Sequence, residues 1–145
     1  MIALGADHAG YEFKEKIKSV LKSLGLEYQD FGTDSPESTD YPDYAHKVAE
    51  AVSTNKAERG ILVCGTGIGM SIVANKHNGV RAAAVESVEA SRLSRQHNNA
   101  NILCLGARIT PWDKAQEIVK AFLTTPFEGG RHQRRVEKIH TLTKL

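Results

Sequence analysis

The chain has 145 residues, of which 41% are hydrophobic and 25% are charged, and its formal net charge is +2. These values predict one globular domain spanning residues 1–145, and the charge is too small to indicate nucleic-acid binding. No apolar run approaches the roughly 18 residues of a membrane-spanning helix, and the chain begins with an apolar run instead of a secretory leader. Because both cysteines lie in apolar runs, we expect free thiols and a cytoplasmic location. From the small net charge and the short apolar runs we expect neither a nucleic-acid nor a membrane partner.

Short apolar runs alternate with stretches of helical periodicity along the whole chain. In chain order they predict strand 2–6, helix 11–24, strand 26–31, helix 43–52, strand 60–63, helix 70–76, strand 80–85, helix 88–96, strand 102–105, helix 111–123 and helix 131–142. Gly25 suits the residue after the first helix, and Pro111 suits the first residue of the fifth. Such short, apolar strands indicate a five-stranded parallel sheet covered on both faces, a three-layer α/β/α Rossmann-like domain.

The most informative stretch is Cys64-Gly65-Thr66-Gly67-Ile68-Gly69, which follows the predicted strand 60–63. Backbone N–H groups of a glycine turn before a helix form an anion-binding nest, which suits one phosphate or one developing oxyanion. A dinucleotide fingerprint would need glycine at Met70, and the Gly-Lys-Ser/Thr of a P-loop is also absent. A glycine turn that only packs a strand closely against a helix explains the same residues equally well.

Several reactive side chains follow predicted strands. Cys64 ends one strand beside backbone N–H groups that favour a thiolate, although a lone cysteine at a strand end is usually inert. Cys104 lies inside its strand, so we expect it in the core. Asp7 and His8 follow the first strand and Arg108 follows the fifth, so they are expected at the same sheet edge as Cys64.

Other candidates lie on helices. His97 and Asn98 follow the predicted helix 88–96, which places them nearer the opposite edge of the sheet, and a histidine there can simply cap the helix. Arg131 and Arg135 share one face of the last helix and suit a phosphate, but the residues alone favour a solvated basic face. The remaining histidines have no comparable setting; they are His46, His77, His132 and His140.

Six collinear motifs covering essentially the whole chain resemble the ribose-5-phosphate isomerase B family, which also includes galactose-6-phosphate and allose-6-phosphate isomerases. The motifs are Gly5-Ala6-Asp7-His8-Ala9-Gly10, Thr39-Asp40-Tyr41-Pro42-Asp43-Tyr44, Cys64-Gly65-Thr66-Gly67-Ile68-Gly69, Ala74-Asn75-Lys76, Ser94-Arg95-Gln96-His97-Asn98 and Glu128-Gly129-Gly130-Arg131-His132. The resemblance implies interconversion of ribose 5-phosphate and ribulose 5-phosphate, in the non-oxidative branch of the pentose phosphate pathway, without a metal or organic cofactor. It also implies a homodimer or a dimer of dimers with active sites at subunit interfaces, where we expect the C-terminal helix to pack on a partner.

The same resemblance implies roles for individual residues. Cys64 is the base that moves a proton between C1 and C2, and His97 helps to open the sugar ring. Asp7, Asn98 and the turn at Thr66 act on the sugar. Around the cis-enediolate the implied contacts are Gly65, Thr66, Gly67, Ile68 and Gly69, and toward the phosphate they are His8, Arg108, Arg131 and Arg135. We expect Tyr41, Thr66 and Met70 to limit the size of the substrate.

Two alternatives remain open from the sequence. One is an isomerase of a six-carbon sugar phosphate; the galactose enzyme of the family has two different subunits, so one chain with a complete set of residues argues against that substrate. The other is a non-catalytic phosphate- or nucleotide-binding module, which leaves Cys64, His97 and Asp7 without a role. One branch of the family carries a glutamate where this chain has Met70, so Cys64 indicates the thiol branch.

Overall fold

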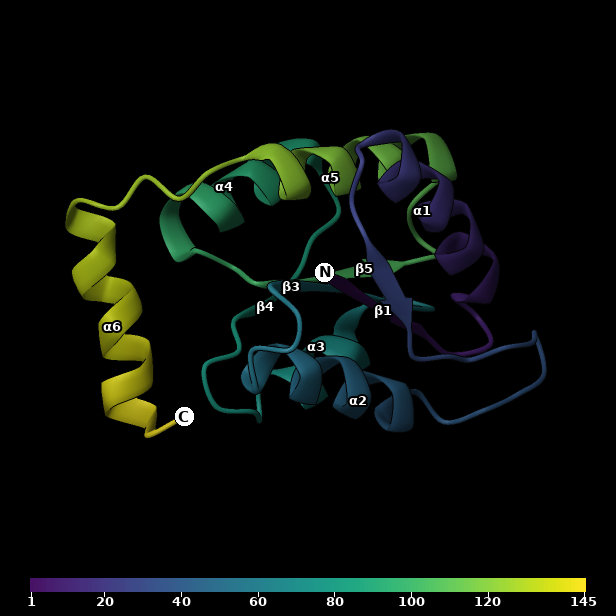
Figure 1. Cartoon of the computed structure of the whole chain (residues 1–145), viewed down its shortest axis with the longest axis horizontal. Helices are drawn as coiled ribbons and strands as arrows, with labels where there is room; N and C mark the ends of the chain where they lie inside the picture. The colour runs from purple at the N-terminus through teal and green to yellow at the C-terminus, as the bar shows by residue number, and fades with distance from the viewer.

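Five parallel strands form one sheet in the order β2-β1-β3-β5-β4 (Figure 1). In the computed structural model, which describes residues 1–145, the strands are β1 (Ile2–Ala6), β2 (Tyr28–Asp30), β3 (Arg59–Cys64), β4 (Ala82–Ala84) and β5 (Ile102–Gly106). Every residue of β1 and β5 is buried, as expected for central strands whose two faces are both covered. Cys64 pairs with Gly106 and Val63 with Ala6, so the carboxyl ends of the central strands lie level with one another.

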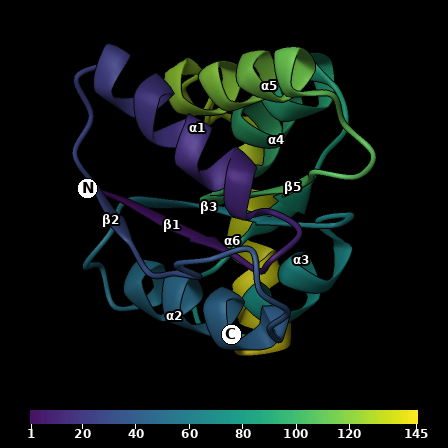
Figure 2. The same cartoon turned by 90° about the vertical axis from the view of Figure 1, so that its right-hand side faces the viewer.

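Helices cover both faces of the sheet. They are α1 (Tyr11–Ser23), α2 (Tyr41–Ser53), α3 (Ile68–Ala74), α4 (Val88–Asn98), α5 (Trp112–Thr124) and α6 (Arg131–Thr143). Figures 1 and 2 show α1, α4 and α5 on one face and α2 and α3 on the other, which is the predicted three-layer architecture. None of these helices is both long and apolar enough to cross a membrane.

Alternation along the strands divides the core between these two faces. In β3, Ile61 and Val63 join the core beneath α1 and α5, whereas Leu62 and Cys64 join the core beneath α2 and α3. The Cys64 side chain therefore points toward the helix that follows it. Helix α6 belongs to neither layer: it stands beside the sheet, and only His132 and Val136 of its residues are buried (Figure 1).

A buried lysine ties α1 to β2. Lys14 is 1% exposed, and its ammonium donates hydrogen bonds to the carboxylates of Asp30 and Glu15, while Lys18 lies 2.7 Å from both carboxylates. Burial by itself would raise the pKa of Asp30, but the hydrogen bonds from Lys14 and Lys18 outweigh it and hold that pKa below its usual value. The network holds α1, and with it the loop that precedes α1, against the sheet.

The structure moves several predicted boundaries. Helix α3 begins at Ile68, two residues before the predicted start, because Gly67 with φ 81° acts as its N-cap. Pro111 is the N-cap of α5 and not its first helical residue. The predicted strand 80–85 shortens to Ala82–Ala84, and the N–H of Arg81 instead donates to a side-chain oxygen. Gly25 follows the end of α1 with φ 71°, as predicted.

Candidate active site

The glycine turn places the Cys64 thiol against the start of α3. Cys64 is 5% exposed, and its Sγ accepts a hydrogen bond from the N–H of Gly67 at 3.1 Å. The φ of 81° at Gly67 gives the backbone this orientation, and it is unfavourable for any residue with a Cβ. A Cβ added at Gly67 would also lie 3.0 Å from the backbone of Leu105. Thr66 adds a second local contact, since its hydroxyl accepts from the N–H of Ile68 at 3.2 Å.

Asp7 lies beside this turn because β1 and β3 are neighbours. Its N–H donates to the carbonyl of Val63 at 3.2 Å, which joins the two strand ends. Its carboxylate is nearly buried and accepts from the N–H groups of Ala9 and Gly10 at 3.0 and 3.2 Å. Helix α1 follows β1 onto one face and α3 follows β3 onto the other, so this pair of strands is the switch point where open α/β sheets bind ligands.

His8 presents a defined tautomer at the same edge. The N–H of Thr39 donates to Nδ1 of His8 at 3.2 Å. An Nδ1 that accepts a hydrogen bond carries no proton, so the ring hydrogen is on Nε2 and is available to donate to an anionic oxygen.

Two further predicted residues frame the glycine turn. The N–H of Arg108 donates to the carbonyl of Gly65 at 3.0 Å, and its guanidinium lies 3.3 Å from where a Cβ on Gly65 would be. On another side, the Tyr41 ring lies so close to Gly69 that a Cβ there would be 2.5 Å from the ring. A side chain at Gly69 would therefore displace the Tyr41 ring, whereas one at Gly65 would shift the Arg108 side chain only slightly.

Two other predictions at this edge have different outcomes. Cys104 is fully buried, as predicted, and burial followed by the nearby Cys64 raises the pKa of its thiol, so it is unsuited to proton transfer. Met70 is also 0% exposed and belongs to the core under α2. Cys64 belongs to the same core cluster, and the expectation that Met70 helps to limit substrate size stays a prediction.

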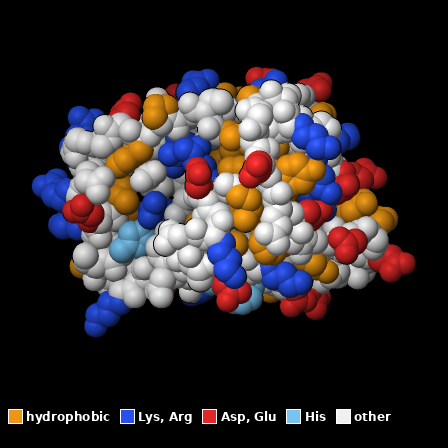
Figure 3. Space-filling model, viewed as in Figure 1, with side chains coloured by type: hydrophobic (Ala, Val, Ile, Leu, Met, Phe, Trp, Pro, Cys, Tyr) orange, Lys and Arg blue, Asp and Glu red, His pale blue; other side chains and the backbone are white.

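His97, Asn98, Arg131 and Arg135 lie at the opposite end of the sheet. Helix α4 ends just before Ile102, the first residue of β5, whereas Cys64 pairs with Gly106, the last residue of β5. Four residues of strand at about 3.3 Å each separate the two ends by about 13 Å. Figure 3 shows lysine and arginine side chains at this end of the molecule, where α6 lies. Within one chain the two halves of the predicted site do not meet.

The setting of His97 includes two residues that the sequence analysis missed. Its ring stacks on that of His132, with centroids 4.3 Å apart and planes inclined by 14°. Oε1 of Glu128 lies 3.9 Å from Nε2 of His97 and 3.7 Å from Nε2 of His132. Burial, and then the charges of His97 and Arg131, lower the pKa of His132. The sequence analysis gave His132 no setting comparable to that of His97, whereas the structure stacks the two rings. The sequence signals for this contact were the place of His132 four residues after Glu128 and its position in the motif Glu128–His132.

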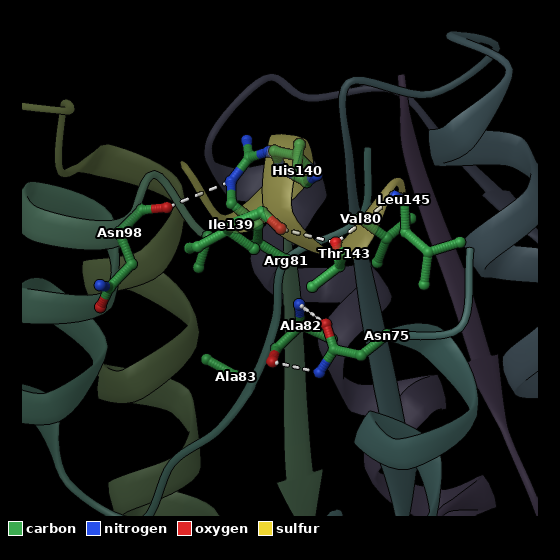
Figure 4. A pocket seen from close by; sticks show the side chains of 11 residues that line it. Asn75, Val80, Arg81, Ala82, Ala83, Asn98, Ile139, His140, Thr143 and Leu145 are labelled. Carbon is green, nitrogen blue, oxygen red and sulfur yellow. Dashed lines mark hydrogen bonds between the residues drawn. The ribbon is translucent and has the colours of Figure 1, made fainter. Parts of the chain in front are cut away.

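Asn98 lies at the edge of a separate cavity beside α6. The cavity has a volume of about 360 Å³ and is lined by 11 residues, among them Asn75, Arg81, Asn98, Ile139 and His140 (Figure 4). Nε of Arg81 donates to the Asn98 carbonyl at 3.1 Å, and Nη1 of Arg81 lies 2.8 Å from Nε2 of His140. Since none of the groups around Cys64 lines it, this cavity is distinct from the glycine turn.

A thiol, a fixed carboxylate, an imidazole and directed N–H groups thus lie at the carboxyl ends of β1 and β3, the switch point of the sheet. A thiol can accept and return a proton, and backbone N–H groups stabilise charge that develops on oxygen. The fold is that of an α/β protein, and the groups at its switch point are suited to acid–base chemistry on a small anionic molecule.

Comparison with known proteins identifies the family. The sequence model of the family described as Ribose/Galactose Isomerase matches residues 2–139. Ribose-5-phosphate isomerase B of Escherichia coli is 49% identical over 138 residues, which are 95% of this chain and 93% of that protein. D-erythrulose-4-phosphate isomerase of Pectobacterium atrosepticum is 45% identical over 139 residues, covering 95% and 91%. The structure of ribose-5-phosphate isomerase B from Mycoplasma genitalium with bound ribulose-5-phosphate superposes with a TM-score of 0.95 at 43% identity, covering 99% of this chain and 95% of that one. The chain belongs to the ribose/galactose isomerase family and is a sugar isomerase.

Proposed function

We propose that the protein interconverts D-ribose 5-phosphate and D-ribulose 5-phosphate, in the non-oxidative branch of the pentose phosphate pathway. The observation that carries the proposal is the Cys64 thiol, which accepts the Gly67 N–H beside the fixed carboxylate of Asp7. Relatives named for this reaction, one of them solved with ribulose-5-phosphate, support the choice of substrate.

Cys64 acts as the base of the proton shift. As a thiolate it takes the proton from C2 of the open-chain aldose, and the electron pair moves onto the carbonyl oxygen to give a cis-enediolate. The N–H groups of the turn stabilise this negative charge, and the loss of one such donor typically costs about 3–4 kcal/mol of transition-state stabilisation. A proton then passes from the hydroxyl on C2 to the oxygen on C1, so that the negative charge moves to O2. The thiol returns its proton to C1 as the C2 carbonyl forms, which yields the ketose. Asp7 and Thr66 contact the sugar hydroxyls during the shift.

His97 opens the sugar ring before the proton shift. Most of the substrate is a closed furanose, so a proton must leave the anomeric hydroxyl while another reaches the ring oxygen. Asn98 holds the sugar beside His97. The phosphate binds to His8, Arg108, Arg131 and Arg135, and its binding energy orients the reacting carbons.

The active site forms between two copies of the chain. His97 and Cys64 belong to opposite ends of one sheet, so a partner subunit supplies His97, Asn98, Arg131 and Arg135 to the thiol of its neighbour. Exposed apolar side chains support such a contact: Ile68 and Ile72 on α3 are 56% and 57% exposed, and Leu142 on α6 is 79% exposed. A homodimer, or a dimer of dimers, completes the site, with α6 packed on the partner.

The test is kcat/KM measured side by side on ribose 5-phosphate, allose 6-phosphate and D-erythrulose 4-phosphate, the last because one relative is named for it. We expect the highest value for ribose 5-phosphate. The variant Cys64→Ala should lose turnover while it still binds the sugar phosphate, and Cys104→Ala is the matched control that removes a thiol from the core. Near-normal turnover by Cys64→Ala would overturn the role of Cys64 as base.

The role of His97 is tested with substrates that differ in ring closure. A four-carbon sugar phosphate cannot form a furanose, because its terminal oxygen carries the phosphate. His97→Asn should therefore lower kcat/KM for ribose 5-phosphate much more than for D-erythrulose 4-phosphate. Equal losses on both substrates would remove His97 from ring opening.

A further inference from the structure

We propose that His97, Glu128 and His132 form a binding site for a divalent transition-metal ion, and that the bound ion inhibits the enzyme by occupying His97. One ligand atom from each residue lies within 4.8 Å of the other two. The inhibitory part of this proposal rests on the function proposed above, whereas the binding part does not.

The distances are close to those of a metal centre. Glu128 Oε1 lies 3.9 Å from Nε2 of His97 and 3.7 Å from Nε2 of His132. Bonds of about 2.0–2.1 Å to a tetrahedral zinc ion place neighbouring ligand atoms about 3.3 Å apart. The carboxylate thus needs to approach each imidazole by only a few tenths of an ångström.

The proposed site requires the side chain of His97 to rotate. The two imidazole rings are stacked and nearly parallel, so their lone pairs do not yet converge on one point. His97 is 41% exposed at the end of α4 and is free to turn about its side-chain bonds, whereas His132 is buried and stays in place. The N–H of Glu128 donates to the carbonyl of Gln96 at 3.1 Å, which fixes the loop bearing the carboxylate against α4.

The donor set selects the class of metal. Two imidazoles and one carboxylate suit Zn²⁺, Cu²⁺ or Ni²⁺, with water at the remaining position, whereas Ca²⁺ and Mg²⁺ prefer sites made of oxygen alone. Arg131 and Arg135 act on His132 as nearby positive charges and oppose a cation. We therefore expect affinity for Zn²⁺ in the micromolar range, well below that of a structural zinc site.

Binding is measured by calorimetric titration of Zn²⁺ into the full-length protein carrying Cys64→Ala, which removes the thiol as a competing ligand. We expect one ion per chain, and an affinity at least about tenfold lower when His132→Asn or Glu128→Gln is added. His46→Asn is the matched control, because His46 forms the other histidine pair of the chain, 2.7 Å from His77. Co²⁺ should give the visible absorption of a tetrahedral site, with the same dependence on the variants. Equal affinities in all four proteins would overturn the site.

Inhibition is measured with Zn²⁺ on the protein that retains Cys64. We expect loss of turnover on ribose 5-phosphate, little loss on D-erythrulose 4-phosphate, and relief of the inhibition by Glu128→Gln. Equal inhibition on both substrates would place the ion at the thiol and overturn inhibition through His97. A protein without isomerase activity would refute the proposed function, and the titration would still decide the metal site.

Discussion

Mixing two variants that are each expected to be inactive tests whether the active site is shared between subunits. Cys64→Ala removes the proposed base, and His97→Asn removes the proposed ring-opening residue. Within one chain Cys64 lies beside Gly106 at the carboxyl end of β5, whereas the helix that bears His97 ends before Ile102 at its amino end. The two ends of β5 are about 13 Å apart, so neither variant can repair its own site. In a two-fold dimer, each mixed pair contains one site with both residues intact and one site with neither.

Random assortment fixes the size of the effect. Half of the dimers are mixed and half of their sites are intact, so the mixture should recover about a quarter of wild-type kcat on ribose 5-phosphate. The variants carry different affinity tags, are unfolded and refolded together, and the mixed species is purified and verified by native mass spectrometry. Each variant refolded alone is the control. Verified mixed dimers that remain as inactive as the parents would refute a shared site.

Three further predictions concern the turn, the phosphate contact and the buried ion network. Gly67→Ala should lower kcat by about 10²–10³-fold, because it displaces the N–H that faces the thiol. Gly25→Ala is the control, since Gly25 has a similar φ of 71° with open space around it and its substitution should cost only about 1–2 kcal/mol in the free energy of unfolding. Equal kcat values in the two variants would contradict this reasoning. Arg135→Ala should raise KM for ribose 5-phosphate about tenfold with little change in kcat, as expected for a lost charged hydrogen bond. The neighbouring Arg134→Ala is the control and should leave KM unchanged. If neither variant changes KM, the arginines of α6 form a solvated basic face and do not bind the phosphate. The pKa of Asp30 is lowered in the folded state, so its contribution to stability is present above its unfolded pKa and is lost as the pH falls through the folded value. Asp30→Asn should therefore cost about 2–3 kcal/mol at pH 7, since it leaves its buried lysine partner with one carboxylate fewer, and chemical denaturation should show this difference shrinking below about pH 4.

Local patterns in the sequence are sufficient for the fold class and for half of the site. Apolar runs of four to six residues alternating with helical periodicity identify the layers, because a parallel sheet must bury both faces. The turn from Cys64 to Gly69 is recognisable because only glycine permits its backbone and its close contacts. The first residue of α3 is less predictable from the sequence, since this helix starts at Ile68, within the turn itself.

Contacts between distant segments are what the sequence left undetermined. The order β2-β1-β3-β5-β4 makes β1 and β3 neighbours and thereby brings Asp7 beside Cys64. The same topology places His97 at the amino end of β5, where it stacks on His132 and faces Glu128. The sequence predicted the shared edge of Asp7 and Cys64 and the opposite edge for His97. It did not predict that β1 pairs with β3 or that His97 stacks on His132, because local chain geometry carries no information on which distant segments pair. Residue types and local backbone thus indicate the chemistry, whereas the packing of the sheet sets which of the reacting groups one chain can bring together.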